Sequence, residues 1–107
     1  MTERIGIVSY GIAGNIFSIK KAVESVGGNA FIIYEPADFS KADKIIIPGV
    51  GSFVDAMEEI NKIGFIEQIK SYEKPILGIC LGMQILATIG YEYGKTEGLD
   101  LVNAEVV

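Results

Sequence analysis

The fold of this chain is constrained most by its short apolar runs. Glycine or proline bounds these runs, and they are separated by segments in which apolar residues have helical spacing. The run Ile45-Ile46-Ile47 lacks polar alternation, which is typical of a parallel strand covered on both faces. Apolar residues recur every three or four positions from Ile16 to Val26, which predicts one face of a helix. The alternation predicts an α/β fold with an open, mostly parallel, doubly wound (flavodoxin-like) sheet and helices on both faces.

The expected elements follow from this pattern. Asn15 is a suitable N-cap for the first helix, and Gly27-Gly28 a suitable end. The connector 36–43 has room for one helical turn. The chain ends on Val106-Val107 inside an expected strand, and we therefore expect a truncated domain. The expected strands are 4–9, 30–34, 44–47, 76–79 and 99–107; the expected helices are 16–26, 53–61, 65–72 and 81–89, with loops at 48–52 and 90–98.

Composition narrows the function classes. The 107 residues suit one domain, and 14 acidic against 9 basic residues give a net charge of −5, which argues against nucleic-acid or anionic-membrane binding. No apolar run is long enough for a transmembrane helix, and the N-terminus does not resemble a secretory signal peptide. A single cysteine excludes an internal disulfide and favours the cytoplasm. The absence of histidine excludes a histidine base or metal ligand from this chain.

The segment Gly78-Ile79-Cys80-Leu81-Gly82 carries the strongest chemical signal. A nucleophile between two glycines, at the junction of a strand and a helix, is the arrangement of a nucleophile elbow. The sharp turn strains the backbone of the nucleophile, and the glycines remove side chains that would collide. The N–H groups and dipole of the following helix favour the thiolate. An isolated cysteine is more often a buried structural residue, but both glycines and the strand–helix junction favour Cys80 as a nucleophile.

A second glycine-rich loop, Pro48-Gly49-Val50-Gly51-Ser52, also follows an expected strand and precedes a helix. Parallel strands end at the same edge of a sheet, so we expect this loop beside Cys80. A thioester-forming cysteine needs N–H donors for its oxyanion; Leu81 would supply one, and Val50 or Gly51 the other. The alternatives are an ordinary turn and a phosphate-binding loop, although the Walker glycine–lysine pattern is absent.

The two loops together resemble the class I (triad) glutamine amidotransferases. GICLGMQ at 78–84 is similar to their nucleophile motif, and PGVGSF at 48–53 resembles the branch formed by the glutaminase subunit of imidazole glycerol phosphate synthase, in histidine biosynthesis. Met83, Tyr10-Gly11 and Glu97-Gly98-Leu99 fit the same branch. The resemblance covers nearly the whole chain but only about the first half of a typical member. Residues 1–107 would thus be the N-terminal half of one amidotransferase domain.

The resemblance implies a role for each matching residue. Cys80 would attack the glutamine carboxamide and form a thioester, while Leu81 and the Val50–Gly51 peptide would form the oxyanion hole. Gly49, Gln84 and Glu92 would bind L-glutamine, although Glu92 is equally compatible with a solvated loop residue. Ammonia would pass to a synthase (cyclase) subunit, a (β/α)₈ barrel. The resemblance implies no metal or organic cofactor.

Departures from the family pattern define the alternatives. The catalytic His and Glu of the family lie in its second half, so we expect no glutaminase activity from these 107 residues alone. Ser9 replaces a common Asp, and the segment 11–14 is one residue longer than usual, which leaves open an amidotransferase of bacterial surface-sugar synthesis. A non-catalytic flavodoxin-like binding module would have an unreactive thiol. PfpI-type hydrolases usually have histidine after the cysteine, where this chain has Leu81.

Overall fold

The computed structural model describes residues 3–11, 16–92 and 94–107. Within them, a four-stranded parallel sheet has the order β2-β1-β3-β4. Its strands are β1 (Arg4–Val8), β2 (Asn29–Ile33), β3 (Lys44–Ile47) and β4 (Ile76–Gly78). The predicted parallel α/β sheet is confirmed, and each of its strands lies within a residue of the expected bounds.

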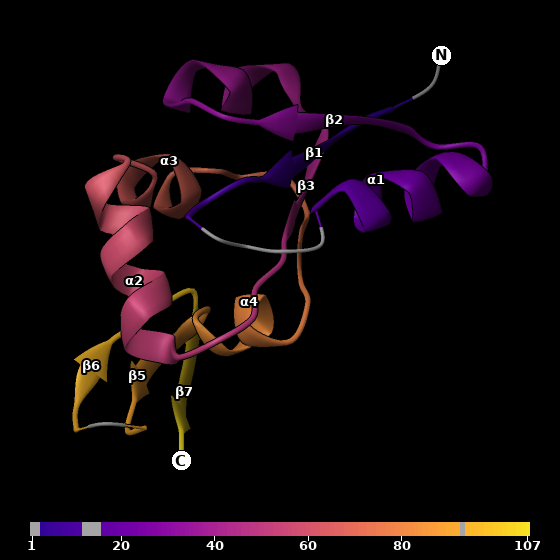
Figure 1. Cartoon of the computed structure of the whole chain (residues 1–107). Helices are drawn as coiled ribbons and strands as arrows, with labels where there is room; N and C mark the ends of the chain where they lie inside the picture. Colours follow the sequence, from indigo (N-terminus) through magenta and orange to yellow (C-terminus); the bar gives the residue numbers. More distant parts are fainter. Residues whose placement is uncertain (1–2, 12–15, 93) are drawn as a thin grey trace.

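Helices cover both faces of this sheet (Figure 1). Ile46 of β3 belongs to one apolar cluster, and helix α1 (Ile16–Ser25) packs against this cluster. Ile45 and Ile47 belong to the other apolar cluster. That cluster includes the buried residues of α2 (Phe53–Lys62) and α3 (Ile66–Lys70). Successive side chains of a strand point to opposite faces, so an unbroken isoleucine run serves a sheet covered on both sides. The connector after β2 forms a 3₁₀ helix, η1 (Pro36–Lys41).

Helix α1 is shorter than the sequence pattern predicts. It ends at Ser25, and Gly27 takes a φ of 87°, so the chain turns before Val26 completes the apolar face. Val26 is 84% exposed, and its expected place on the core face is wrong. The expected N-cap, Asn15, and the longer segment at Ile12–Gly14 lie outside the described residues.

The largest difference concerns the expected helix 81–89. Helix α4 spans only Leu81–Gln84, and the chain then enters strand β5 (Ala87–Gly90). This strand pairs with β6 (Thr96–Glu97), inside the expected loop 90–98, and with β7 (Val102–Val106), which is shorter than the expected strand 99–107. These strands form a separate three-stranded sheet, beside α2 and α4 in Figure 1.

The cause of this difference is pairing between distant backbone segments. The amide of Leu99 donates to the carbonyl of Ile85, and the amide of Leu101 donates to the carbonyl of Leu86, at 2.8 Å each. The amide of Asp100 donates to the carbonyl of Ala87 at 3.0 Å. These hydrogen bonds favour an extended strand. A short apolar run suits a buried strand as well as a buried helix, so periodicity alone does not decide between them.

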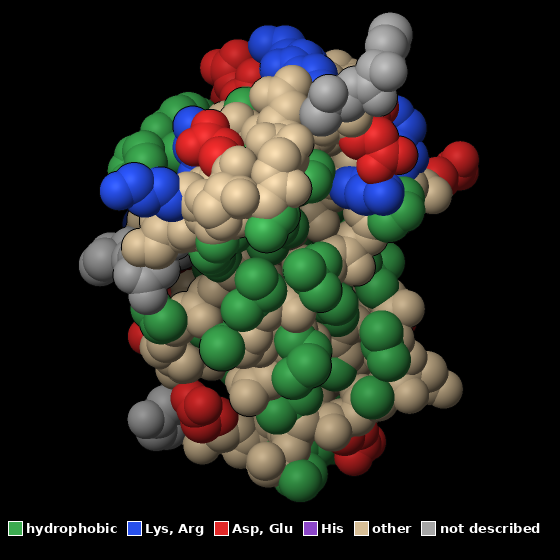
Figure 2. Space-filling view, turned by 90° about the vertical axis from the view of Figure 1, so that its right-hand side faces the viewer, with side chains coloured by type: hydrophobic (Ala, Val, Ile, Leu, Met, Phe, Trp, Pro, Cys, Tyr) green, Lys and Arg blue, Asp and Glu red, His purple; other side chains and the backbone are tan. Residues whose placement is uncertain are grey.

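Strand β4 forms one edge of the four-stranded sheet within the described residues. Leu77 of β4 and Met83 of α4 are both more than half exposed. Figure 2 shows hydrophobic side chains gathered over much of the face seen there. None of the described helices is long and apolar enough to cross a membrane.

Candidate active site

Cys80 lies on the turn between β4 and α4, as the sequence predicts. Its φ of 54° and ψ of −119° are rarely adopted by residues other than glycine, and its side chain is exposed. The turn is closed by the amides of Met83 and Gln84, which donate to the carbonyl of Cys80 at 3.0 and 3.2 Å. The fold thus holds an exposed thiol on a strained backbone.

The two glycines of the elbow leave space for backbone. A Cβ atom on Gly78 would lie 2.6 Å from the Cα of Met83, and a Cβ on Gly82 would overlap the carbonyl oxygen of Ile47. Both glycines are therefore needed for space, but against Met83 and Ile47 and not, as the sequence predicts, against the nucleophile. Helix α4 has a single turn, so its dipole is smaller than that of the expected longer helix.

The glycine-rich loop lies beside the elbow, also as predicted. Ile47 of β3 and Gly78 of β4 are register partners, and the amide of Ile79 donates to the carbonyl of Ile47 at 2.9 Å. The Cβ position of Gly49 is 3.1 Å from both the Cβ of Leu81 and the amide nitrogen of Gly82. Two loops 30 residues apart in the chain thus meet at the carboxyl edge of the sheet.

Gln84 and Glu92, two of the predicted glutamine-binding residues, share one small pocket. Its volume is about 130 Å³, and its other lining residues are Phe53, Gly90, Tyr91, Val106 and Val107. Gln84 offers an amide and Glu92 a carboxylate, which suit the polar ends of an amino acid. The strands β5 and β7 border this pocket, so the unexpected second sheet brings Glu92 to Gln84.

Val50 and Gly51 border a different, larger pocket of about 330 Å³. Its other lining residues are Tyr10, Ser52, Asp55, Ala56, Glu58 and Glu59. The three carboxylates make it a poor site for the carboxylate of glutamine. Cys80 is not among the lining residues of either of these two pockets. In the described residues, β4 is an edge strand, so no further strand of its sheet closes the space beyond the elbow.

Two residues that shape the loop, Ser52 and Tyr10, are not among the site residues that the sequence predicts. The hydroxyl of Ser52 caps α2 by accepting a hydrogen bond from the amide of Asp55 at 3.2 Å. The hydroxyl of Tyr10 donates a hydrogen bond to the carbonyl oxygen of Pro48, and burial raises the pKa of Tyr10 to about 12. A serine directly before a helical segment was a readable signal for the cap. Nothing local to Tyr10 indicates a partner 38 residues away.

No group of histidine, cysteine, aspartate and glutamate side chains suited to a metal ion occurs among the described residues. The elbow itself offers the thiol of Cys80 and the backbone N–H groups around it. An exposed thiol on a strained turn, next to a glycine-rich loop, is an arrangement suited to acyl transfer through a covalent intermediate.

Comparison with known proteins agrees with this class. The family model "Glutamine amidotransferase class-I" matches residues 7–98, and the chain belongs to this family. The chain is similar to the imidazole glycerol phosphate synthase subunit HisH 1 of Campylobacter jejuni, with 49% identity over 107 residues, covering 96% of this chain and 53% of the relative.

Two further relatives carry the name imidazole glycerol phosphate synthase subunit HisH. That of Sulfurimonas denitrificans is 46% identical over 106 residues, covering 96% of this chain and 51% of the relative. That of Bacillus licheniformis is 43% identical over 106 residues, covering 96% and 50%. The chain spans about half the length of the curated relatives it matches. The resemblance found in the two loops is confirmed.

Proposed function

We propose that this chain is the N-terminal half of the glutaminase subunit of imidazole glycerol phosphate synthase. In the whole enzyme it would hydrolyse L-glutamine and pass ammonia to a synthase subunit during histidine biosynthesis. The observation that carries the proposal is the exposed Cys80 at a φ of 54°, on a turn whose flanking glycines are packed against backbone. The names of the relatives support the choice of this branch.

The chemistry assigned to Cys80 is nucleophilic. Its thiolate attacks the carboxamide carbon of glutamine, a C–S bond forms, and the oxygen becomes an oxyanion. The N–H of Leu81 and that of Val50 or Gly51 donate to this oxygen. The C–N bond then breaks, ammonia leaves with a proton from an acid, and water hydrolyses the thioester to glutamate. Gln84 and Glu92, which share a pocket, would hold the amino-acid part of the substrate.

Proton transfer requires residues outside this sequence. The chain contains no histidine, the side chain that most often transfers protons near neutral pH. The resemblance assigns this role to a His and a Glu in the half of the relatives that the chain does not match. The open edge of β4 and the exposed Leu77 and Met83 are suitable for contact with further polypeptide.

The proposed assembly is cytoplasmic and heterodimeric. Its partner would be a (β/α)₈-barrel synthase subunit, and the site would use no metal or organic cofactor. The net charge of −5 makes nucleic acid and anionic membranes poor partners.

The test is ammonia release from glutamine. The samples are the 107-residue chain, a whole subunit containing it in complex with the synthase, and that complex carrying Cys80→Ser. We expect turnover only in the unchanged complex, with a loss of at least about a thousandfold on Cys80→Ser. Ser40→Ala, in an exposed position of η1, is the control and should leave turnover unchanged.

Turnover by the 107 residues alone at the rate of the complex would contradict the proposed division of the site. Full activity of Cys80→Ser would refute the thioester mechanism. An active glutaminase that delivers ammonia only to a sugar-modifying synthase would move the protein to the surface-sugar branch. A thiol that forms no adduct with a glutamine-like electrophile in the complex would favour the non-catalytic binding module.

A further inference from the structure

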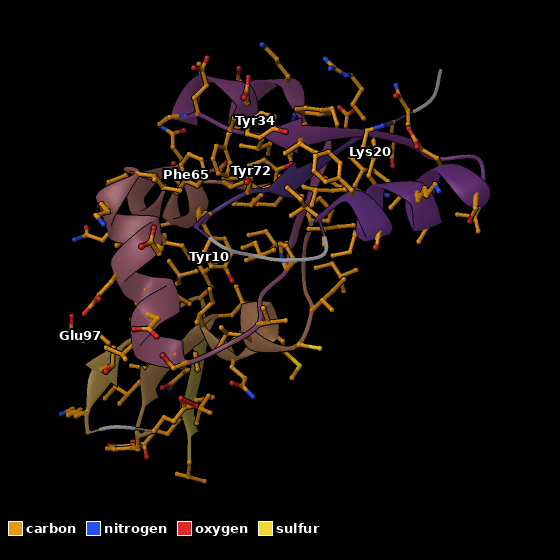
Figure 3. The ribbon with its side chains drawn as sticks, viewed as in Figure 1. Tyr10, Lys20, Tyr34, Phe65, Tyr72 and Glu97 are labelled. Carbon is orange, nitrogen blue, oxygen red and sulfur yellow. The ribbon has the colours of Figure 1, made fainter. Side chains whose placement is uncertain are left out.

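Tyr10 joins the end of the first strand to the start of the glycine-rich loop. It lies two residues beyond β1, is 4% exposed, and its hydroxyl donates to the carbonyl oxygen of Pro48. In Figure 3 its side chain lies in the interior, between α2 and the strands. The carbonyl of Pro48 and the amide of Gly49 belong to one planar peptide unit. A hydrogen bond that fixes this carbonyl therefore also fixes the direction of the Gly49 N–H.

The packing around Gly49 supports the same role for Tyr10. A Cβ atom at position 49 would overlap the Tyr10 hydroxyl, so the glycine leaves space for that hydroxyl. Tyr10 also lines the pocket bordered by Val50 and Gly51. The side chain of Tyr10 thus binds the Pro48–Gly49 peptide and also lines the pocket bordered by Val50 and Gly51.

Tyr10 is suited to act as a permanent donor. Burial raises its pKa to about 12, so the hydroxyl keeps its proton throughout the neutral range. A buried carbonyl that loses its hydrogen-bond donor costs more free energy than the bond itself contributes. The hydrogen bond should therefore hold the loop start in one orientation.

We propose that Tyr10 is a positioning residue, which holds the Pro48–Gly49 peptide and thereby orients the Val50–Gly51 peptide toward Cys80. Tyr10 does not touch the substrate in this arrangement. Its contribution to catalysis depends on the proposed glutaminase function, because that reaction gives the Val50–Gly51 peptide an oxyanion to bind. The hydrogen bond by which Tyr10 orients the 48–52 loop does not depend on that function, and a separate experiment measures its effect.

The chain provides a matched control in Tyr72. Its hydroxyl also donates to a backbone carbonyl, that of Ala42, at 3.1 Å. Ala42 precedes β3, whereas Pro48 follows it, so the two tyrosines bind at opposite ends of the same strand. Both Tyr→Phe changes remove one hydroxyl and keep the ring. The carbonyl of Ala42 also accepts a hydrogen bond from Nζ of Lys74 at 3.5 Å, so Tyr72→Phe should cost less stability than Tyr10→Phe.

The first experiment compares backbone amide NMR spectra and relaxation of the ¹⁵N-labelled protein with those of Tyr10→Phe and Tyr72→Phe. We expect Tyr10→Phe to shift and broaden the amide signals of Gly49, Val50 and Gly51, with the alternative loop conformers rising about fivefold in population. Tyr72→Phe should leave these three signals in place. Equal changes in both variants, or none in Tyr10→Phe, would overturn the proposal.

A measurement on the unchanged protein covers the case in which Tyr10→Phe does not fold. The Tyr10 hydroxyl proton should exchange slowly with water and show a nuclear Overhauser effect to the Hα atoms of Gly49. A rapidly exchanging hydroxyl without this effect would overturn the proposal.

The second experiment measures glutamine hydrolysis in the whole complex. Tyr10→Phe should lower kcat about tenfold and leave the KM for glutamine nearly unchanged, because only the oxyanion contact is weakened. An altered loop in NMR together with unchanged kcat would refute the role of Tyr10 in catalysis. If the unchanged complex has no glutaminase activity, the proposed function fails, while the NMR result still decides whether Tyr10 holds the loop.

Discussion

The turn after β4 and the turn after β3 leave neighbouring parallel strands at the same edge, and each contains two glycines. In the elbow after β4, both Gly78 and Gly82 are needed for space, because a Cβ atom on either would enter backbone. In the loop after β3, Gly51 has a φ of 101° and nothing within 4 Å of its Cβ position. Close packing therefore accounts for both glycines of the elbow and for Gly49 of the loop, whereas Gly51 serves backbone conformation.

This difference indicates how each turn is stabilised. The elbow is held by direct backbone contacts with Ile47 and Met83, which compensate for the strain at Cys80. The loop is held by the conformational preference of Gly51 and by the hydroxyl of Tyr10 on Pro48. We therefore expect the elbow to be rigid and the loop to respond to small changes nearby.

Gly82→Ala should have the largest effect, because its methyl group would overlap the carbonyl oxygen of Ile47. We expect the free energy of unfolding to fall by about 3 kcal/mol or more, measured by urea denaturation. Gly27→Ala, at a positive φ with open space, is the control and should cost only about 1–2 kcal/mol. A Gly82→Ala variant as stable as the parent would show that the elbow is not closely packed.

Alkaline pH should weaken the loop through Tyr10. The pKa of Tyr10 is about 12 in the folded protein and 10.0 ordinarily, so the unfolded chain loses this proton first. The stabilisation is complete below pH 10 and is lost as pH rises from 10 to 12, by up to about 3 kcal/mol. Urea denaturation at pH 9 to 12 measures this loss, which should be smaller in Tyr10→Phe. The same loss in both proteins would exclude Tyr10 as its source.

Gly51→Ala tests the conformational role of the second glycine. The added methyl group has free space, so only the positive φ opposes it. We expect a loss of about 1–2 kcal/mol in the free energy of unfolding. A loss as large as that of Gly82→Ala would remove the distinction between the two turns. Crystallography of the variant would show whether the loop adopts a new conformation.

Cys80→Gly should have the smallest effect and the opposite sign. Glycine relieves the strain at a φ of 54°, and little packing is lost because Cys80 is exposed. The greater freedom of the unfolded chain offsets part of the gain, which leaves a net stabilisation of about 1 kcal/mol. Thermal denaturation measures this change, and Cys80→Ala is the control that keeps the strain. Destabilisation of Cys80→Gly would show that the turn stores no strain.

The sequence alone determined the main sheet and the position of the two turns. The isoleucine run predicts a strand covered on both faces, and Ile45, Ile46 and Ile47 divide between two apolar clusters as expected. The Gly-x-Cys-x-Gly spacing at the end of an apolar run predicts the elbow, although the contact that requires Gly82 is with the carbonyl oxygen of Ile47 in the neighbouring strand. The apolar run and the glycine spacing are local patterns, which the sequence records directly.

The tertiary structure alone decided three other features. The segment 87–90 is a strand because its backbone pairs with residues beyond Thr96, although its apolar pattern suits a buried helix equally well. That second sheet also brings Glu92 to the pocket of Gln84. The hydrogen bond from Tyr10 to Pro48 spans 38 residues. A local pattern contains no information on such contacts, since the free energy that selects them comes from partners that only the folded chain brings together.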